Sequence, residues 1–217
     1  EASDDLPMAI HDMIKDTIAA HKRIIFNGNG YSDEWVAEAE RRGLPNIKCM
    51  VDAVPALVKP EAVEIFEKHG VYTKAEMESR AEVMYETYSK TINIEALTMI
   101  DMAKKQIVPA TIKYQTSLAE SVNAIKAASS AVDTSVQEAL MADISTNLKD
   151  MYVALAHLEE VAGKAEAMEE GAEQGHYYHD VVFTAMDELR KPADKLEMLV
   201  AKSAWPFPSY GDLIFEV

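Results

Sequence analysis

Residues 136–168 read VQEALMADISTNLKDMYVALAHLEEVAGKAEAM, and the spacing of the apolar side chains in this stretch decides the fold class. Apolar residues recur at alternating steps of three and four positions, with polar residues between them, which is the period of one face of an α-helix. The sequence therefore predicts a helix of about nine turns. The apolar stripe consists of Val136, Leu140, Ile144, Leu148, Met151, Leu155, Leu158, Val161, Ala165 and Met168.

The predicted start of this helix carries two overlapping capping boxes, Thr134 with Gln137 and Ser135 with Glu138. In such a box the first side chain accepts a backbone N–H and the second reaches back to the cap, so both satisfy donors that the first turn leaves free. Thr73 and Glu76 form the same pattern before a second long stripe. That stripe contains Met77, Ala81, Met84, Tyr88, Ile92, Met99, Met102 and Ile107.

Two prolines interrupt the later part of the helical pattern. Pro109 lacks a backbone donor and disfavours helical geometry at Val108, so we expect a kink or a break there before the stripe resumes. Pro192 predicts another kink within the last stripe. The resumed stripe contains Ile112, Leu118, Val122 and Ile125, and the last one contains Val182, Met186, Leu189, Leu196 and Val200.

The first 70 residues predict shorter elements. We expect a helix at 6–24, a turn at the NGNG of 27–30, a helix at 33–42, a proline-containing link at GLPN (43–46) and a helix at 61–68. The predicted fold is all-α: a long antiparallel helical bundle with a smaller N-terminal helical cap and a Pro/aromatic-rich, non-helical C-terminal tail. The expected domains are the cap at 1–71, the long-helix bundle at 72–203 and a docking tail at 204–217.

Charge and composition exclude several classes of partner. The 217 residues include 21 basic and 37 acidic side chains, a net charge of −16, and no segment gathers the basic ones. We therefore expect no nucleic-acid partner and no membrane partner. Cys49, the single cysteine, closes no intrachain disulfide, and no apolar run approaches the roughly 20 residues that span a bilayer, so a cytoplasmic location is expected. Because the chain starts at Glu1 rather than Met, we expect a piece of a longer protein.

The NGNG turn resembles a phosphate-binding loop only superficially. A phosphate loop presents free backbone N–H groups at a helix start, but here Ser32 is a natural N-cap and the next two residues, Asp33 and Glu34, would repel an anion. The stretch lacks the third glycine of a dinucleotide loop and the Lys-Ser/Thr of a P-loop. We interpret it as a structural turn, in which the glycines tolerate positive φ.

Three other features of the sequence bear on possible chemistry. Glu173 and His176 have the Glu-x-x-His spacing of di-iron bundles, but the sequence holds one copy and such a site needs two, so a metal is disfavoured. Lys48 is expected to lower the pKa of Cys49 slightly, yet no histidine lies near that cysteine in sequence. The twelve methionines are interpreted as core filling rather than as a promiscuous binding groove. No catalytic, cofactor-binding or metal residue is assigned.

The terminal stretch WPFPSYGDLIFEV (205–217) concentrates apolar side chains after two prolines, and such a surface needs a cover. The cover is either the bundle itself or another domain or subunit. The apolar side chains are those of Trp205, Phe207, Tyr210, Leu213, Ile214, Phe215 and Val217.

Three stretches make the chain similar to a known family: HKRIIFNGNGYSDEWVAEAERRGLPN (21–46), INIEALTMIDMAKKQIVPATIKY (92–114) and ADKLEMLVAKSAWPFPSYGDLIFEV (193–217). In order, they resemble the C-terminal region of type III glutamine synthetases, the large bacterial form of the enzyme. The resemblance implies ATP-dependent ligation of glutamate and ammonia to glutamine, with Mg or Mn ions, in an active site between subunits of a ring-shaped homo-oligomer.

The resemblance also implies where the chemistry lies. The family's β-grasp and catalytic domains carry the metal, ATP and phosphoryl contacts, and none of their motifs is found here. We therefore expect a structural and assembly role, with no cofactor bound by this chain and no activity of the fragment alone. Two alternatives stay open: a freestanding helical-bundle interaction module, and a di-iron bundle enzyme.

Overall fold

A computed structural model describes residues 5–25 and 27–215, and all the regular structure in them is helical, which confirms the all-α prediction. The chain divides into two units, residues 1–48 and 49–217. The second unit begins 23 residues before the boundary expected at 71/72, counted from 49 to 72, because two short helices after Lys48 belong with the long ones.

The first unit contains helix α1 (Leu6–His21), the 3₁₀ turn η1 (Lys22–Ile24) and helix α2 (Asp33–Arg41). These bounds agree with the predicted helices at 6–24 and 33–42. The Asp5 carboxylate caps α1 by accepting the Met8 N–H at 3.2 Å. Ser32 caps α2, as predicted, because its hydroxyl accepts the Trp35 N–H at 3.3 Å.

The second unit opens with α3 (Met50–Leu57) and α4 (Pro60–Lys68). Helix α4 was predicted, but α3, which contains Pro55, was not. Proline is tolerated in a short helix where few intrahelical bonds are lost. Here the burial of the apolar face of α3 stabilises the helix. Val51 and Val54 are buried in a small cluster with Ala81 and Tyr85 of the following helix.

Helix α5 (Lys74–Met102) starts at the predicted capping box: the Thr73 hydroxyl accepts the Glu76 N–H at 3.3 Å, and the Glu76 carboxylate accepts the Thr73 N–H at 2.7 Å. The buried stripe differs from the prediction in its first half. Tyr85 is buried where Met84 was expected, and Met84 is exposed. The packing of α3 and α8 on α5 selects this face, which the methionine spacing alone did not indicate.

The chain remains helical through Pro109, so of the predicted kink or break the break does not occur. The five residues Ala103–Ile107, which precede Val108 and the proline, form a π-helical turn, η2, in which the Val108 N–H donates to the Ala103 carbonyl. Helix α6 (Val108–Ala128) follows directly. A π turn contains one more residue than an α turn. The wider turn redirects the carbonyls that a proline ring meets in a regular helix, so the helix continues.

Helix α7 (Ser135–Glu166) starts where it was predicted, but neither capping box forms. Instead the Asp133 carboxylate accepts the Ser135 N–H at 2.9 Å, and the Thr134 hydroxyl donates to Glu138 at 2.7 Å. Asp133 precedes the helix by two residues and competes successfully for the free donor. The middle of the predicted stripe is buried: Ile144, Met151, Leu155, Leu158, Val161 and Ala165.

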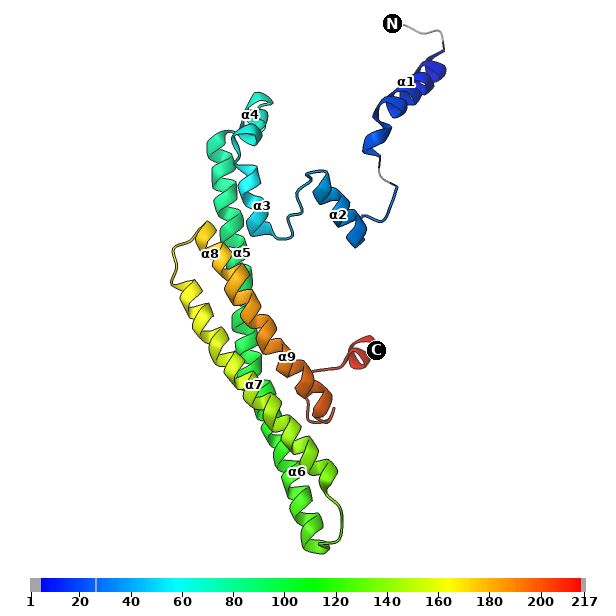
Figure 1. Cartoon of the computed structure of the whole chain (residues 1–217). Coiled ribbons are helices and arrows are strands. Elements are labelled where there is room, and N and C mark those ends of the chain that lie inside the picture. Colours follow the sequence, from blue (N-terminus) through cyan, green and yellow to red (C-terminus); the bar gives the residue numbers. More distant parts are fainter. Residues whose placement is uncertain (1–4, 26, 216–217) are drawn as a thin grey trace. The chain divides into compact units, whose positions relative to one another are not determined.

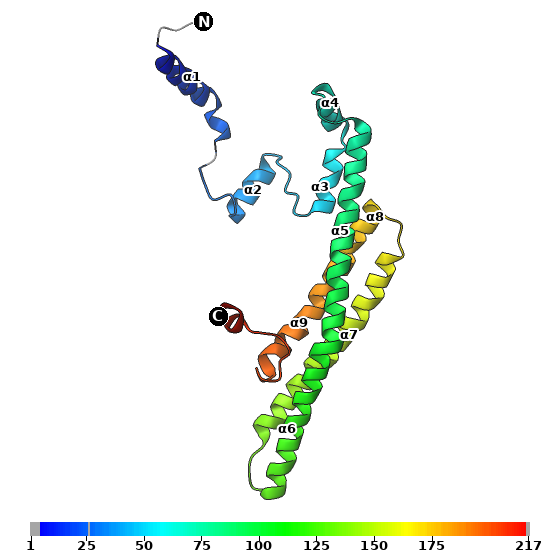
Figure 2. The same cartoon turned by 180° about the vertical axis from the view of Figure 1, so that it is seen from behind.

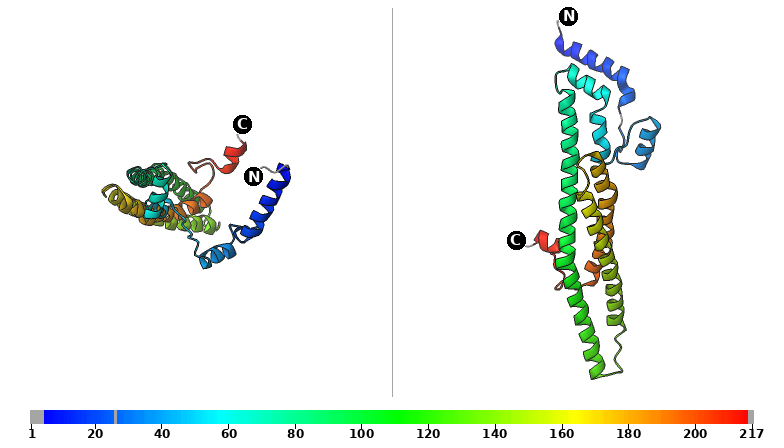
Figure 3. Two further views of the ribbon diagram at one scale, coloured as in Figure 1. Left: turned by 90° about the horizontal axis from the view of Figure 1, so that it is seen from above. Right: turned by 90° about the vertical axis from the view of Figure 1, so that its left-hand side faces the viewer.

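After α7 come α8 (Ala172–Tyr177), the π turn η3 (Tyr178–Val182) and α9 (Phe183–Leu199), and α9 continues past the buried Pro192. Within the second unit, α5 and α6 run in one direction, α7 returns beside them, and α9 runs with α5 again (Figure 1). Figure 2 shows α3 beside the N-terminal half of α5, and the end-on view in Figure 3 shows the long helices side by side. One cluster of buried residues from α5, η2, α7, η3 and α9 forms the core.

The tail was predicted to be non-helical, and this is wrong for its last part. Helix α10 (Tyr210–Phe215) follows the two prolines. Ser209 and Asp212 cap it, because the Ser209 hydroxyl accepts the Asp212 N–H at 3.4 Å and Asp212 accepts the Ser209 N–H at 2.8 Å. Val217, named in the tail prediction, lies outside the described residues.

Candidate interaction surfaces

The first part of the tail packs back onto the bundle. The rings of Trp205 and Phe207 meet edge-to-face with centroids 6.2 Å apart, and both are partly buried against the main core. Beside them lies a mainly apolar cavity of 230 Å³. Its apolar lining includes Met99, Met102, Met151, Leu189, Trp205 and Phe207. The bundle thus covers the aromatic pair, and docking on the bundle is one of the two possibilities that the sequence left open for the tail.

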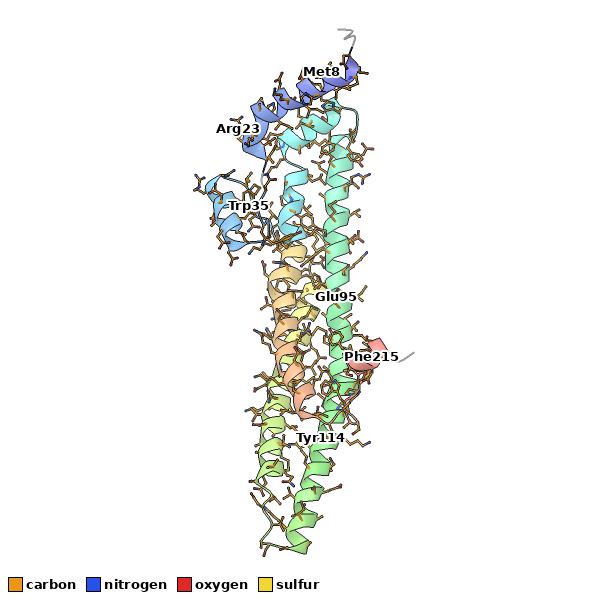
Figure 4. The ribbon with its side chains drawn as sticks, turned by 90° about the vertical axis from the view of Figure 1, so that its right-hand side faces the viewer. Met8, Arg23, Trp35, Glu95, Tyr114 and Phe215 are labelled. Atoms are coloured by element: carbon orange, nitrogen blue, oxygen red, sulfur yellow. The ribbon has the colours of Figure 1, made fainter. Side chains whose placement is uncertain are left out.

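The last part of the tail remains uncovered. Leu213, Ile214 and Phe215 of α10 are 66%, 65% and 79% exposed, and Tyr210 is exposed as well. Phe215 is labelled on this helix in Figure 4. Three consecutive large apolar side chains in water form a surface that favours burial by a partner. The bundle therefore covers the aromatic pair but leaves α10 available for a contact.

Helix α1 in the first unit also has exposed apolar side chains. Its apolar residues recur at helical spacing, yet none of its residues is buried. Met8, labelled in Figure 4, belongs to this set. An amphipathic helix with no covered face gains its stability from a partner rather than from its own domain. The exposed apolar residues of α1 are Leu6, Met8, Ile10, Met13, Ile14 and Ile18.

The turn at 27–30 leads into a helix start whose donors are already used. Ser32 accepts the Trp35 N–H, and the pKa of Glu34 is lowered by a backbone N–H and by the Ser32 hydroxyl. These contacts support the interpretation as a capped helix start rather than a phosphate loop. Positive φ, expected of these glycines, is not found at Gly30. The Asn29 side chain accepts the Tyr31 N–H at 3.0 Å and stabilises the turn locally.

Glu173 and His176 both lie on α8, but Glu173 is exposed and the ring of His176 faces Asp52 of α3, with Nδ1 3.7 Å from the nearest carboxylate oxygen. His179 lies 2.7 Å from its neighbour Asp180. Within residues 5–25 and 27–215, no three His, Cys, Asp or Glu side chains are grouped to hold a metal ion. The half-site that the Glu-x-x-His spacing indicated is not completed by these residues.

Cys49 precedes α3, and its thiol donates to the Asp52 carboxylate at 3.0 Å. Burial raises the pKa of this thiol, and the hydrogen bond to the acid raises it further. The expected lowering by Lys48 is therefore wrong, because the contacting group is an anion that disfavours a thiolate. The residue is a poor nucleophile.

The methionines divide between two environments. Met77, Met151 and Met186 are buried, which confirms core filling for these positions. Others lie on exposed faces, with Met198 at 84% exposure. Sequence spacing did not separate the two groups, since both occur near apolar stripes.

None of the helices in the described part of the chain is both long enough and apolar enough to cross a bilayer.

A family model described as the glutamine synthetase C-terminal domain matches residues 9–126. Three curated relatives match nearly the whole chain. A glutamine synthetase of Butyrivibrio fibrisolvens is 38% identical over 216 residues, all of this chain and 31% of the relative.

The other two relatives are a type-3 glutamine synthetase of Dictyostelium discoideum and a glutamine synthetase of Bacteroides fragilis. They are 29% and 30% identical over 211 residues, 95% of this chain and 29% of each relative. The chain thus spans about 30% of the length of these relatives. Since the family model covers more than half of the chain, the chain belongs to the glutamine synthetase C-terminal domain family.

Proposed function

We propose that the chain is the helical C-terminal region of a bacterial type III glutamine synthetase and acts in its assembly. The whole protein would join glutamate and ammonia with the help of ATP and Mg or Mn, in the cytoplasm. The catalytic groups would lie in the β-grasp and catalytic domains, outside these 217 residues. Support comes from the family membership and from relatives named glutamine synthetase that are about three times as long.

The observation that carries the assembly role is the pair of uncovered apolar helices, α1 and α10. Burying one large aliphatic or aromatic side chain stabilises a contact by about 1.5–3 kcal/mol. Each helix presents several such side chains without a cover in its own unit. We assign the covers to the other domains of the same enzyme and to neighbouring subunits of a ring-shaped homo-oligomer.

A two-piece reconstitution tests this proposal. The region upstream of this chain and the chain itself would be expressed as separate polypeptides, alone and together. We expect glutamine formation from glutamate, ammonia and ATP only in the co-expressed, co-purifying complex, and no turnover above blank from this chain alone. Full activity and unchanged size of the upstream piece alone would contradict the assembly role, and turnover by the chain alone would contradict the assignment of catalysis elsewhere.

A further inference from the structure

A mainly apolar groove, the α5/α9 groove, runs between these two helices in the second unit. It consists of two spaces of 430 and 230 Å³ that share Met99 and Arg190 in their linings. The smaller space is the cavity beside Trp205 and Phe207, so the groove ends at the aromatic pair of the tail. The lining of the larger space also includes Ile94, Phe183 and Met186.

The walls of this groove are open to solvent. Ile94 is 65% exposed and Phe183 is 45% exposed, although both side chains are large and apolar. Three methionines line the groove as well, and their flexible thioether side chains adapt to the shape of an inserted apolar group. An open apolar groove between two helices has the form that receives an amphipathic helix. The three methionines are Met99, Met102 and Met186.

Helix α10 has the length and the side-chain spacing of a helix that fits such a groove. Tyr210, Leu213 and Ile214 stand at positions i, i+3 and i+4 and therefore share one face of α10. All three are exposed, Tyr210 at 84%. The six residues of α10 span about 9 Å, and the groove extends about 12 Å along α5 from Ile94 to Met102. The helix is thus shorter than the groove.

The contacts of α10 hold it away from the groove of its own chain. Figure 1 shows α10 beyond α9, standing off the long helices. Asp212 accepts the Ser209 N–H and pairs with Lys202, and Pro208 fixes the backbone φ directly before this cap. None of the described residues of α10 lines either part of the groove. The chain therefore presents an open groove and, separately, a helix that matches it.

Two copies of the chain satisfy both surfaces at once. If α10 of each copy lies in the groove of the other, the contact is two-fold symmetric and closed. Each of the three side chains on the apolar face of α10 buries roughly 100–150 Å². With the groove area beneath them, two such contacts bury on the order of 1,200–1,800 Å², which is the size of a stable protein–protein interface.

We propose that the α5/α9 groove binds helix α10 of a second copy of this chain, which receives α10 of the first copy in return. The apolar face of α10 then lies against Ile94, Phe183 and the methionines of the groove. This inference rests on the assembly role proposed above, because it names the surface that receives α10. Each copy carries a net charge of −16, so the two copies repel and added salt strengthens the contact.

Disulfide trapping tests the position of α10 directly. Cys49→Ser removes the single cysteine, and Ile94→Cys and Ile214→Cys are then introduced into separate copies of the 217-residue chain. Mild oxidation of the mixture is expected to link position 94 of one copy to position 214 of the other, as identified by mass spectrometry of the linked peptides. Val153→Cys in place of Ile94→Cys is the control on an exposed position outside the groove, and about tenfold less product is expected.

Sedimentation equilibrium of the 217-residue chain measures the strength of the contact. The parent chain is expected to show a reversible monomer–dimer equilibrium. Ile94→Glu with Phe183→Glu is expected to raise the dimer Kd about a hundredfold, because carboxylates would be buried in an apolar contact.

Ile112→Glu with Val153→Glu is the matched control for charge. Both positions are exposed and apolar and lie outside the groove lining, so the dimer Kd is expected to change less than about threefold. All four substituted side chains are at least 45% exposed in the parent chain, so the helical circular dichroism of both double variants is expected to match the parent.

Three results would overturn the inference. A parent chain that stays monomeric at about 0.5 mM would exclude the dimer. Loss of the dimer in Leu213→Glu with Ile214→Glu, but not in the groove variant, would mean that α10 binds another surface. A chain carrying both Ile94→Cys and Ile214→Cys that links only within itself would mean that the groove receives its own tail.

The failure of this contact is distinguishable from the failure of the assembly role. An active, co-purifying complex in the two-piece reconstitution, together with a monomeric 217-residue chain, would overturn the groove contact and leave the assembly role standing.

Discussion

The Lys202 ammonium lies 2.5 Å from the Asp212 carboxylate and so connects the segment after α9 to the tail helix α10. The same carboxylate accepts hydrogen bonds from the Ser209 N–H at 2.8 Å and from the Ser209 hydroxyl at 2.7 Å. Asp212 thus holds both the start of α10 and its attachment to the bundle. The exposed apolar side chains of α10 depend on this residue for their presentation.

Acid is expected to unfold α10. The Lys202 ammonium, followed by the Ser209 hydroxyl and N–H, lowers the pKa of Asp212 to about 2. A carboxyl whose folded pKa lies below its unfolded value, about 3.9, stabilises the folded state above that value and loses this contribution as pH falls toward 2. The ¹³Cα shifts of Leu213 and Ile214 are therefore expected to be helical at pH 5 and to approach coil values near pH 2.

Two variants separate the contributions to this transition. Asp212→Asn removes the ion pair and the charged cap, so coil-like shifts are expected already at pH 7. Lys202→Gln removes the ion pair and keeps the Ser209 contacts, so the midpoint is expected to move upward in pH. Shifts of the parent chain that stay helical down to pH 2, while circular dichroism shows an intact bundle, would contradict the role of Asp212.

The capping box of α5 is expected to contribute to the stability of the second unit. Thr73→Ala removes the acceptor of the Glu76 N–H and should lower the free energy of unfolding by about 1 kcal/mol. Thr98→Ala is the matched control, because Thr98 lies exposed within α5 and its hydroxyl only donates to the Ile94 carbonyl. Urea unfolding followed by circular dichroism measures both changes. Equal effects of the two substitutions would show that the box does not stabilise the helix.

Substitution by alanine is expected to change the free energy of unfolding in opposite directions at two glycines. Gly163 lies within α7 with open space around it, so Gly163→Ala should raise the free energy of unfolding by about 0.5–1 kcal/mol. At Gly175 of α8 an added Cβ would lie 3.1 Å from Tyr85 Cδ1 and 3.3 Å from Val51 Cγ1. Both neighbours are buried and cannot move freely, so Gly175→Ala should destabilise by about 1–3 kcal/mol.

Urea unfolding of the two glycine variants compares them directly. Stabilisation by Gly175→Ala would mean that α8 does not pack as closely against α3 and α5 as described.

The burial pattern of α7 predicts that shortening an apolar side chain to alanine changes the free energy of unfolding by very different amounts at different positions. Leu158 is fully buried in the core, so Leu158→Ala should destabilise the second unit by about 2–5 kcal/mol. Val153 lies on the same helix but is 62% exposed, and Val153→Ala should change the free energy of unfolding by less than about 0.5 kcal/mol. Thermal or urea unfolding measures the difference. A similar loss at both positions would place the apolar face of α7 elsewhere.

The sequence predicts helices well wherever a long apolar stripe and a cap agree. The start of α5 follows from such a signal, and α7 starts where its stripe was predicted to start, although neither capping box forms. The bounds of α1, α2 and α4 agree with the predicted ranges to within three residues. All members of the last predicted stripe, from Val182 to Val200, are buried. These signals are local, and the neighbouring helices reinforce rather than override them.

The structure differs from the sequence predictions where tertiary packing or an unusual turn determines the conformation of the backbone. Pro109 continues a helix because a π turn precedes it, and a π turn has no clear sequence signal. Helix α3 forms around Pro55 because Val51 and Val54 have a partner face on α5. The proximity of Ser89 and Gln174 was not predicted, since the fold brings them together from positions 85 residues apart, counted from 89 to 174. Their polar character alone gave no indication.

The central claim is that this chain assembles a larger enzyme through uncovered apolar helices. Sedimentation velocity of the complete protein carrying Leu213→Glu, Ile214→Glu and Phe215→Glu together tests it most directly, with Val153→Glu as a control on an exposed apolar position of the bundle. We expect the triple variant to sediment as a smaller species while the control keeps the parent size. An unchanged sedimentation coefficient of the triple variant would contradict the claim.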